Sequence, residues 1–590
     1  MKKYLYLFPM IFLVQQSFAQ SNDLPIFSTS EEHFLTNENL SLKFGITNPP
    51  STKPRSMAEW EELQAVNITW RNGDSNNNKK ILSEIVKAAS KECEVWLTCE
   101  DSTNVKTYFQ NINTPVPSNV RYHIYKTNSI WSRDYGANSI YLNDVDTLAF
   151  VDWVYNRQSR TADDLQPNSL AAFAKTPLYT TTSGLNGMVH TGGNFMSDGL
   201  GSAFSSDLVV DENVGNTGAI QTTPKSENDI KNILKSYMGI KNYALMEILP
   251  YDVIHHIDMH MKLLDEETIL VGEFPKDVAD GPQIEANIAY ITKNFKTAWG
   301  TDYKIRRVPM PKEKSGGYNG LTSGATYQTY ANALICNKTV ILPVYGQPAE
   351  DTVGINVWKK TMPGYTIYPI NCASIITSLG AIHCISKEMG VADPLWITYK
   401  KIDNVLVNTV ASYPLTAQIK HKSGVKNATL FYTLDLNKGY TGIAMKNIKL
   451  DDWYAEIPVQ NDGSQVFYYV EAEAKSGKKI SKPMVAPKGY YTFSIAQMVA
   501  NDDISALQMK PIFPNPASAM TCIPVTSSTV ENVRIDLVDM YGRVLTNIAN
   551  ENLQIGENQF FIDVSKYASG VYFVTFQTPN QRFSQRLIVR

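Results

Sequence analysis

Cysteine, long hydrophobic runs and an excess of charge of one sign are all scarce in this sequence. Six cysteines in 590 residues are too few for a scaffold built on disulfides. The 54 Lys and Arg residues nearly balance the 57 Asp and Glu residues, which excludes a general electrostatic attraction to nucleic acid or to anionic lipid. No run after the N-terminus approaches the roughly 20 apolar residues of a membrane-spanning helix. With 43% hydrophobic residues, the chain is expected to form several packed globular domains.

The N-terminus has the pattern of a secretory signal peptide over residues 1–19. Lys2 and Lys3 provide the positive start, a short apolar run follows, and small residues stand at Ser17 and Ala19 before the expected cleavage site. Residues 20–54 are taken as an N-terminal segment. The alternative, a membrane anchor, is excluded by the shortness of the apolar run.

Residues 511–590 indicate a separate β domain that follows a linker at 496–510. The region begins with the proline-rich Pro511–Pro516 and continues as short β-type runs at 533–538, 559–564, 571–576 and 586–589. With the Asp539–Arg543 turn, Ser569–Tyr572 and Leu587–Val589, it resembles the C-terminal sorting domain of the type nine secretion system. The resemblance implies handling by that secretion machinery, and a protein secreted or attached to the cell surface after export through the periplasm. An ordinary β-sandwich module is the alternative.

Residues 396–495 indicate a further all-β domain. Strand-type runs at Thr429–Thr433, Trp453–Ile457 and Val466–Ala472 are separated by glycine-containing turns, a rhythm typical of an immunoglobulin-like β-sandwich. The region has no cluster of His, Cys or carboxylate residues, so we expect a supporting role.

Residues 55–395 alternate between helical and strand patterns, which predicts the α/β class. One helical face is formed by Ile81, Leu82, Ile85, Val86 and Ala89. Strands are expected at 94–98, 121–125, 268–272, 339–343 and 365–370. Several polar motifs stand next to these strands, where α/β folds place their chemistry.

Three of the eight histidines stand in the segment His255–His260. If this segment is a strand, as its flanking residues favour, His256, Asp258 and His260 share one face. A zinc site is one alternative, although no His-Glu-x-x-His pattern is present. Half-buried histidines satisfied by their surroundings are another.

Cys384 follows Gly380 in the segment Gly-Ala-Ile-His-Cys, and a thiol at a glycine-bearing turn is typical of a nucleophilic cysteine. Taken alone, the motif has an alternative, because most single cysteines are simply small buried apolar residues. Cys336 and Cys372 have apolar neighbours and are expected to be inert. Cys93 and Cys99 are compatible with a disulfide or with two free thiols.

Two more motifs complete the set. Asp134 lies in Trp131–Gly136, and the paired glycines of His190–Asn194 allow a close backbone approach to a ligand. Each motif alone is also compatible with a simple turn.

Together these motifs, in this order, resemble the guanidine-modifying deiminases. The segment Met57–Glu61 also matches the start of that fold, and the bacterial, Porphyromonas-type peptidylarginine deiminase family is the most similar. The resemblance covers about residues 55–395 and implies a five-bladed α/β propeller with a central site. It predicts hydrolysis of arginine side chains in peptides or proteins to citrulline and ammonia.

The resemblance also implies roles for individual residues. Asp134 and Asp258 hold the guanidinium by its N–H groups, and the Cys384 thiolate attacks the guanidinium carbon. His256 protonates the leaving ammonia and then activates the water that hydrolyses the thiouronium intermediate. Asn332 matches a site asparagine that orients polar groups, although a turn asparagine is the alternative. Further residues expected at the substrate are Trp131, Arg133, Thr191, Gly192 and Gly193.

Other residues indicate whether the substrate is a small molecule or a peptide. Related agmatine deiminases carry an acid where this chain has Thr191, which argues against a small substrate with an ammonium group. Arg157 and Arg160 are candidates to bind the free carboxylate of a C-terminal arginine. Their spacing differs from that of the family by one residue, and two solvated loop charges are the alternative.

No nucleotide or flavin fingerprint is present, so no organic cofactor is expected. Asp163 and Asp164 are candidates for a structural calcium, without EF-hand spacing, and no catalytic metal is predicted. Three alternative functions stay open: an agmatine deiminase-like enzyme, a cysteine hydrolase acting on other amidines or peptides, and an inactive secreted module that binds arginine-rich partners. A cysteine protease would need an oxyanion hole instead of two carboxylates.

Overall fold

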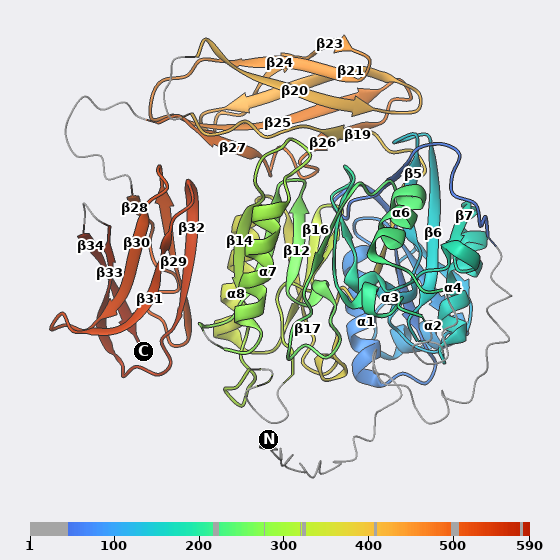
Figure 1. Ribbon diagram of the computed structural model, residues 1–590, viewed down its shortest axis with the longest axis horizontal. Helices are drawn as coiled ribbons and strands as arrows, with labels where there is room; N and C mark the ends of the chain where they lie inside the picture. Colours follow the sequence, from blue (N-terminus) through green and yellow to red (C-terminus); the bar gives the residue numbers. More distant parts are fainter. Residues whose placement is uncertain are drawn as a thin grey trace, which may run out of the picture.

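The computed structural model describes residues 45–157, 159–215, 223–276, 278–318, 320, 326–405, 410–496, 507–578 and 582–590. The predicted signal peptide at 1–19, residues 20–44 of the predicted N-terminal segment and residues 497–506 of the predicted linker lie outside these described residues. Figure 1 shows three bodies, an α/β part and two β-sandwiches packed against different sides of it. No helix in the described ranges is both long and apolar enough to cross a membrane.

Five sheets build the α/β part. In hydrogen-bonded order they are β18 (Lys387–Gly390), β2 (Leu63–Trp70), β3 (Glu94–Cys99) and β4 (Val120–Ile124); β1 (Pro54–Ser56), β5 (Asn138–Leu142), β6 (Thr147–Tyr155) and β7 (Leu178–Thr181), with β8 (Val189–His190) also on β6; β11 (Asn242–Met246), β10 (Ser202–Ser206) and β9 (Met196–Ser197); β12 (Met261–Asp265), β13 (Thr268–Glu273) and β14 (Lys304–Pro309); and β15 (Leu334–Cys336), β16 (Thr339–Val344) and β17 (Thr366–Asn371).

Helices connect the parallel strand pairs of these sheets, which confirms the predicted α/β class. The longer ones are α1 (Asn76–Ala89), α2 (Ser102–Asn111), α4 (Thr161–Ala174), α6 (Glu227–Met238), α7 (Gly281–Asn294) and α8 (Pro348–Thr361). The short ones are α3 (Ser132–Tyr135), α5 (Leu208–Asp211) and the 3₁₀ turns η4 (Gly184–Asn186), η5 (Gly192–Asn194), η6 (Ile257–Met259) and η7 (Ile376–Ser378).

Helix α1 illustrates how the sequence builds these units. Ser75 caps its first turn by accepting a hydrogen bond from the Asn78 amide. The predicted apolar face is buried, with Ile85 and Ala89 both fully covered. The antiparallel pairing of β18 with β2 then joins the last strand of the α/β part to its first long strand, Lys387 lying opposite Asn67.

The strands predicted around residues 94–98, 121–125, 268–272, 339–343 and 365–370 are confirmed as β3, β4, β13, β16 and β17. The strand expected through the histidine-rich segment is wrong. Residues Ile257–Met259 form the 3₁₀ turn η6, and β12 begins only at Met261. His255 precedes this turn with a φ of 58°, a left-handed conformation that interrupts any extended strand. His256, Asp258 and His260 therefore do not share a strand face.

A two-sheet β-sandwich covers residues 396–494. One sheet contains β19 (Trp396–Thr398), β20 (Ser412–Lys420), β24 (Asp452–Pro458) and β23 (Lys446–Lys449), and the other β22 (Thr441–Ala444), β21 (Val425–Thr433), β25 (Gln465–Ala474), β26 (Lys479–Lys482) and β27 (Tyr491–Ser494). The predicted strand runs at 429–433, 453–457 and 466–472 lie within β21, β24 and β25. The two sheets share one buried core.

A second sandwich follows from residue 507. Its sheets are β28 (Leu507–Met509), β29 (Met520–Ser527) and β32 (Gly556–Asp563); and β31 (Val544–Asn552), β30 (Asn532–Val538), β33 (Gly570–Gln577) and β34 (Arg582–Val589). The four strand runs predicted in this region are confirmed by β30, β32, β33 and β34.

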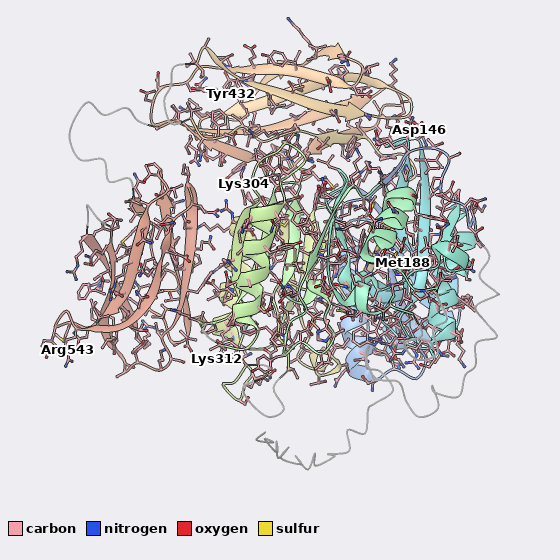
Figure 2. All side chains as sticks on the ribbon, viewed as in Figure 1. Asp146, Met188, Lys304, Lys312, Tyr432 and Arg543 are labelled. Atoms are coloured by element: carbon pink, nitrogen blue, oxygen red, sulfur yellow. The ribbon has the colours of Figure 1, made fainter. Side chains whose placement is uncertain are left out.

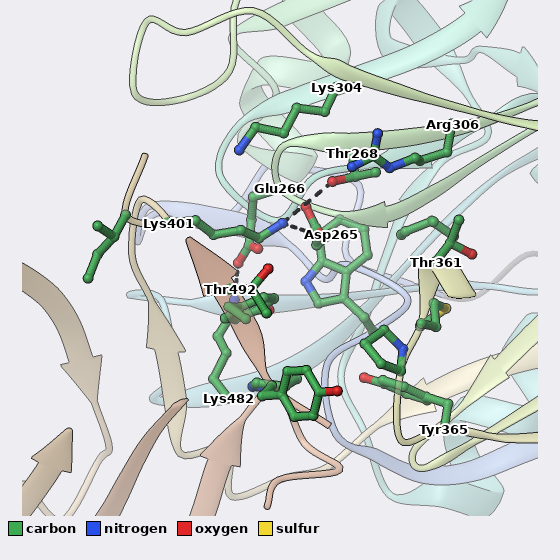
Figure 3. A pocket seen from close by; sticks show the side chains of 18 of the residues that line it. Asp265, Glu266, Thr268, Lys304, Arg306, Thr361, Tyr365, Lys401, Lys482 and Thr492 are labelled. Atoms are coloured by element: carbon green, nitrogen blue, oxygen red, sulfur yellow. Dashed lines mark hydrogen bonds and ion pairs between the residues drawn. The ribbon is translucent and has the colours of Figure 1, made fainter. Parts of the chain in front are cut away.

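Ion pairs attach both sandwiches to the α/β part. Lys401 pairs with Asp265 at 2.6 Å on the side of the first sandwich, and Lys312 pairs with Asp563 on the side of the second. Lys312 lies on the face of the α/β part turned toward the second sandwich, whereas Arg543 marks that sandwich's far tip (Figure 2). Where the three bodies meet, a cavity of about 900 Å³ is lined by charged and aromatic side chains. Figure 3 shows the Lys401–Asp265 pair in its wall.

Candidate active site

Cys384 lies in the turn between η7 and β18, and it is 1% exposed. The turn depends on Gly380, because a Cβ atom there would lie 2.4 Å from Cζ3 of Trp131 and 3.0 Å from the Cys384 Cβ. Trp131 is fully buried against this turn. The Cys384 Sγ is 3.3 Å from Asn332 Nδ2 and 3.7 Å from Asp258 Oδ2. Burial, followed by the charges of Asp258 and Asp134, raises the pKa of the Cys384 thiol well above its ordinary value.

Two buried carboxylates stand at this thiol. Asp134 in α3 is 1% exposed, and Asp258 in η6 is completely buried. Oδ1 of Asp134 and Oδ1 of Asp258 have no hydrogen-bond partner within the described part of the chain. Buried acceptors without donors are costly, so the site is arranged for a ligand that brings several N–H or O–H groups.

The two carboxyl groups titrate differently. Burial, together with the charge of Asp258, raises the pKa of Asp134 to about 7. Burial also acts to raise the pKa of Asp258, but the hydrogen bond and charge of His383, with His256 and Arg133, outweigh it and lower that pKa. Asp258 is therefore ionised at neutral pH, whereas Asp134 changes its charge near neutral pH.

His256 lies beside Asp134, its Nδ1 3.5 Å from Asp134 Oδ1. Burial lowers the pKa of His256 to about 3, so the free site holds it as a neutral imidazole. Gly193 permits this arrangement, because a Cβ atom at this position would be 2.4 Å from His256 Nδ1 and 2.9 Å from Asp134 Oδ1. Gly192 is equally constrained, since its Cβ would lie 2.0 Å from the Arg133 carbonyl oxygen. Thr191, which precedes the two glycines, is buried.

His383 is a site residue that the sequence interpretation missed. Its Nδ1 is 2.7 Å from Asp258 Oδ2, and its Nε2 is 3.0 Å from Glu59 Oε2. Glu59 is also paired with Lys262 and accepts a hydrogen bond from the Ile335 amide at 2.9 Å. Two signals were available, namely the position of His383 next to Cys384 and the presence of Glu59 in the segment Met57–Glu61.

Asn332 and Arg133 hold the same turn from two sides. Asn332 Oδ1 accepts from the His383 amide at 3.1 Å, and its Nδ2 donates to the Asp258 carbonyl at 3.2 Å. Arg133 donates from Nε to the His383 carbonyl at 3.2 Å and pairs through Nη2 with Glu388 at 2.6 Å. The Arg133 guanidinium is thus engaged with protein groups, and its contact with substrate stays a prediction.

The two arginines considered for carboxylate binding lie in different surroundings. Arg160 is 1% exposed and lies near Asp163. Arg157 is half-buried, and its charge acts on Asp134 and His256, lowering the pKa of each. Arg157 is therefore electrically coupled to the candidate site. Its charge also acts on Glu212, whose pKa burial raises to about 7.

The residues considered for metals have protein partners. Asp163 accepts hydrogen bonds from Asn128 and Ser129, and Asp164 accepts from the Tyr155 amide at 2.7 Å. In the described ranges one group of metal-ligating atoms lies close enough together to hold an ion, that of Glu59, His383 and Glu388. Lys262 and Arg133 already neutralise its two carboxylates, so a cation would have to displace them.

Comparison with known proteins finds relatives of two parts of the chain. A family model described as Porphyromonas-type peptidyl-arginine deiminase matches residues 55–389, and one described as a secretion system C-terminal sorting domain matches residues 511–590. A Legionella pneumophila protein named "Putative agmatine deiminase" is 24% identical over 267 residues, which cover 44% of this chain and 72% of that protein. A Mycoplasma capricolum protein of the same name is 21% identical over 361 residues, 56% of this chain and 94% of that protein.

The solved structures support the fold. A crystal structure described as the "Putative Arginine Deiminase from Porphyromonas gingivalis" superposes with a TM-score of 0.50 at 20% identity. The match covers 57% of this chain and 98% of that one.

Proposed function

The chain belongs to the Porphyromonas-type peptidyl-arginine deiminase family and carries a type IX secretion sorting domain, and from this premise we propose that it converts arginine side chains of peptides or proteins into citrulline and ammonia outside the cell. The sorting domain indicates export, followed by secretion or attachment to the cell surface. Membership of the family makes the chain a deiminase, a hydrolase of guanidine C–N bonds. We further propose that its five sheets are the blades of a propeller around the site.

One observation carries the proposal. Among the residues that the structure describes, Asp134 and Asp258 each keep a buried carboxylate oxygen without a hydrogen-bond partner, and Asp258 contacts the Sγ of Cys384. A guanidinium ion is planar and carries N–H pairs that two carboxylates can hold from different sides. Such a clamp fixes the otherwise unreactive carbon in front of the sulfur.

The proposed reaction begins with proton transfer from the Cys384 thiol to His256, favoured when the guanidinium brings positive charge into the site. Sulfur then forms a bond to the guanidinium carbon. The proton held by His256 passes to one nitrogen, which leaves as ammonia and breaks its C–N bond. Neutral His256 next takes a proton from water, and the resulting hydroxide adds to the thiouronium carbon. The C–S bond then breaks, the hydroxyl proton passes to the Cys384 sulfur, and citrulline and the free thiol result. His256 returns to its neutral form by releasing its proton to the departing ammonia or to solvent.

A peptide substrate is favoured by the charges near the site. The charge of Arg157 acts on Asp134 and His256, which supports a position near the site, and we propose that it faces the far end of a bound substrate. A carboxylate at that end is attracted to it, whereas the ammonium group of agmatine is repelled. Thr191 is neutral where agmatine deiminases carry an acid.

An agmatine-like small molecule is the second candidate. Relatives named as agmatine deiminases support it, and so does Glu212, whose charge is coupled to Arg157 and partly offsets it.

The test measures citrulline and ammonia release from three substrates: a peptide ending in arginine, the same peptide amidated, and agmatine. We expect product from the free-ended peptide, and a loss of at least about a thousandfold in the Cys384→Ser variant. The Cys99→Ser variant serves as the control because it removes a thiol that lies outside the site. Consumption of agmatine alone would move the protein to the small-molecule branch. No product from any substrate would favour the inactive binding module.

A further inference from the structure

Two thiols from distant parts of the chain touch outside the candidate active site. The Sγ atoms of Cys93 and Cys336 lie 3.7 Å apart, although 243 residues separate them in the sequence. Both are free in this structure. We propose that Cys93 and Cys336 are a redox pair that closes into a disulfide in the exported protein.

Hydrogen bonds hold the two segments that carry these cysteines against each other. Asn337, which follows Cys336, accepts from the Leu63 amide at 2.8 Å and donates to the Glu92 carbonyl at 3.1 Å. The Glu92 carboxylate in turn accepts from the Thr339 hydroxyl at 2.7 Å. The turn that ends at Cys93 and the β15–β16 turn are thus docked through the residues next to both thiols. Contact between the sulfurs is therefore a consequence of the fold, and closure requires only a small side-chain adjustment.

The other pairing considered from the sequence, Cys93 with Cys99, is incompatible with this fold. Cys93 immediately precedes β3 and Cys99 is its last residue. Each strand residue advances the chain by about 3.3 Å, so the two thiols lie at opposite ends of the strand. Cys384 lies in the candidate active site, where its Sγ contacts Asn332 and Asp258 instead of Cys93 or Cys336.

The exposure of the two thiols indicates which cysteine reacts first. Cys93 is partly exposed, whereas Cys336 is completely buried, and the contact with Cys93 followed by burial raises the pKa of the Cys336 thiol. Cys93 is therefore expected to react first, as the thiolate, with a small external disulfide.

The exchange then proceeds in two balanced steps. Cys93 sulfur attacks one sulfur of the external disulfide, and one thiolate leaves. Cys336 loses its proton and attacks the Cys93 sulfur of the mixed disulfide, and the second thiolate leaves. The two cysteines are oxidised by two electrons, and the external disulfide is reduced to two thiols. The export signalled by the sorting domain takes the chain out of the reducing cytosol, where such a bond does not persist.

The test incubates the full-length protein with glutathione disulfide, blocks the remaining thiols and maps its peptides by mass spectrometry without reduction. We expect one cross-linked species that joins the Cys93 and Cys336 peptides and is two hydrogens lighter than their sum. Because the bond closes a very long loop, the melting temperature of the oxidised protein should exceed that of the reduced protein by about 5 °C.

Two variants make the test decisive. Cys99→Ser should keep the cross-link, whereas Cys93→Ser should lose both the cross-link and the effect of oxidation on the melting temperature. Recovery of Cys93 and Cys336 with both thiols blocked after exhaustive oxidation would overturn the proposal. Cross-linking of Cys93 to Cys99 or to Cys384 would overturn it as well.

Discussion

Nδ1 of His383 lies 2.7 Å from Oδ2 of Asp258, so the residue next to the candidate nucleophile is bonded to one of the two candidate guanidinium ligands. The other ring nitrogen of His383 faces Glu59 at 3.0 Å. The hydrogen bond and the charge of His383 are the largest interactions that lower the pKa of Asp258. His383 thus occupies Oδ2 of Asp258 and leaves its Oδ1 for a ligand.

Replacing His383 tests this relationship. In His383→Gln the pKa of Asp258 should rise, because the hydrogen bond and the electrostatic effect of His383 that lower it are removed. Since guanidinium binding needs the ionised carboxylate, the acidic limb of kcat/KM should move to higher pH, with activity at pH 6 reduced about tenfold or more.

The matched control is His421→Gln in the first sandwich, where the ring Nε2 lies 3.1 Å from Asp393, away from the candidate active site. This variant should keep the wild-type pH profile. An unchanged acidic limb in His383→Gln would show that His383 only fills space.

The raised pKa of Asp134 predicts that the ionised carboxylate needed for function lowers the stability of the fold. Its pKa in the folded protein, about 7, exceeds its ordinary value of 3.8. The protonated carboxyl therefore stabilises the fold at low pH, and this contribution is lost as the pH rises from about 4 to about 7. Asp134→Asn, which cannot ionise, should be inactive yet more stable than wild type at pH 8, by roughly 2–4 kcal/mol. Chemical denaturation at pH 5 and pH 8 checks this, and an equal or lower stability of the variant at pH 8 would contradict it.

Gly193 sets the distance between backbone and site. In Gly193→Ala the new methyl group would meet His256 Nδ1 at 2.4 Å, so the imidazole must move. A displacement of this kind should lower kcat about a hundredfold. Gly73→Ala is the control, because a Cβ atom there meets nothing within 4 Å. Steady-state kinetics of the two variants test this prediction. A Gly193→Ala enzyme with normal kcat would refute the assigned position of His256.

Replacing Arg157 and replacing Arg160 should have different effects, the first on substrate binding and the second on stability. Arg157→Gln should lower kcat/KM for a peptide with a free C-terminal arginine about tenfold, mainly through KM, and leave the amidated peptide unaffected. Arg160→Gln should instead lower the melting temperature, because it removes a buried charge beside Asp163. An equal loss on both peptides in Arg157→Gln would exclude carboxylate recognition by this residue.

Local patterns in the sequence predicted many of the strands and some of the residues that form the candidate site. Strands such as β3 and β16 follow from short apolar runs between turns, and the motifs around Asp134, Asp258 and Cys384 marked residues that the structure brings together. The histidine-rich segment was predicted incorrectly, because the left-handed backbone at His255 leaves no periodic signal. The partner of His383, Glu59, lies 324 residues away, and a contact at that range depends on the closure of the whole α/β part.

Arg133 illustrates the importance of tertiary contacts in another way. Its Nη2 pairs with Glu388, 2.6 Å away and 255 positions later in the sequence, whereas its contact with substrate stays a prediction. Which partner a charge takes is decided by tertiary packing, which the local sequence does not encode.

The covalent intermediate gives the most direct test of the central proposal. The full-length enzyme is mixed with a peptide ending in arginine, quenched in acid during turnover and analysed by intact mass and peptide mapping. The proposal predicts an adduct on Cys384 with the mass of the peptide less one ammonia, accumulating before citrulline and absent from Cys384→Ser. Citrulline formation without an adduct at Cys384, or with an adduct at another residue, would contradict it.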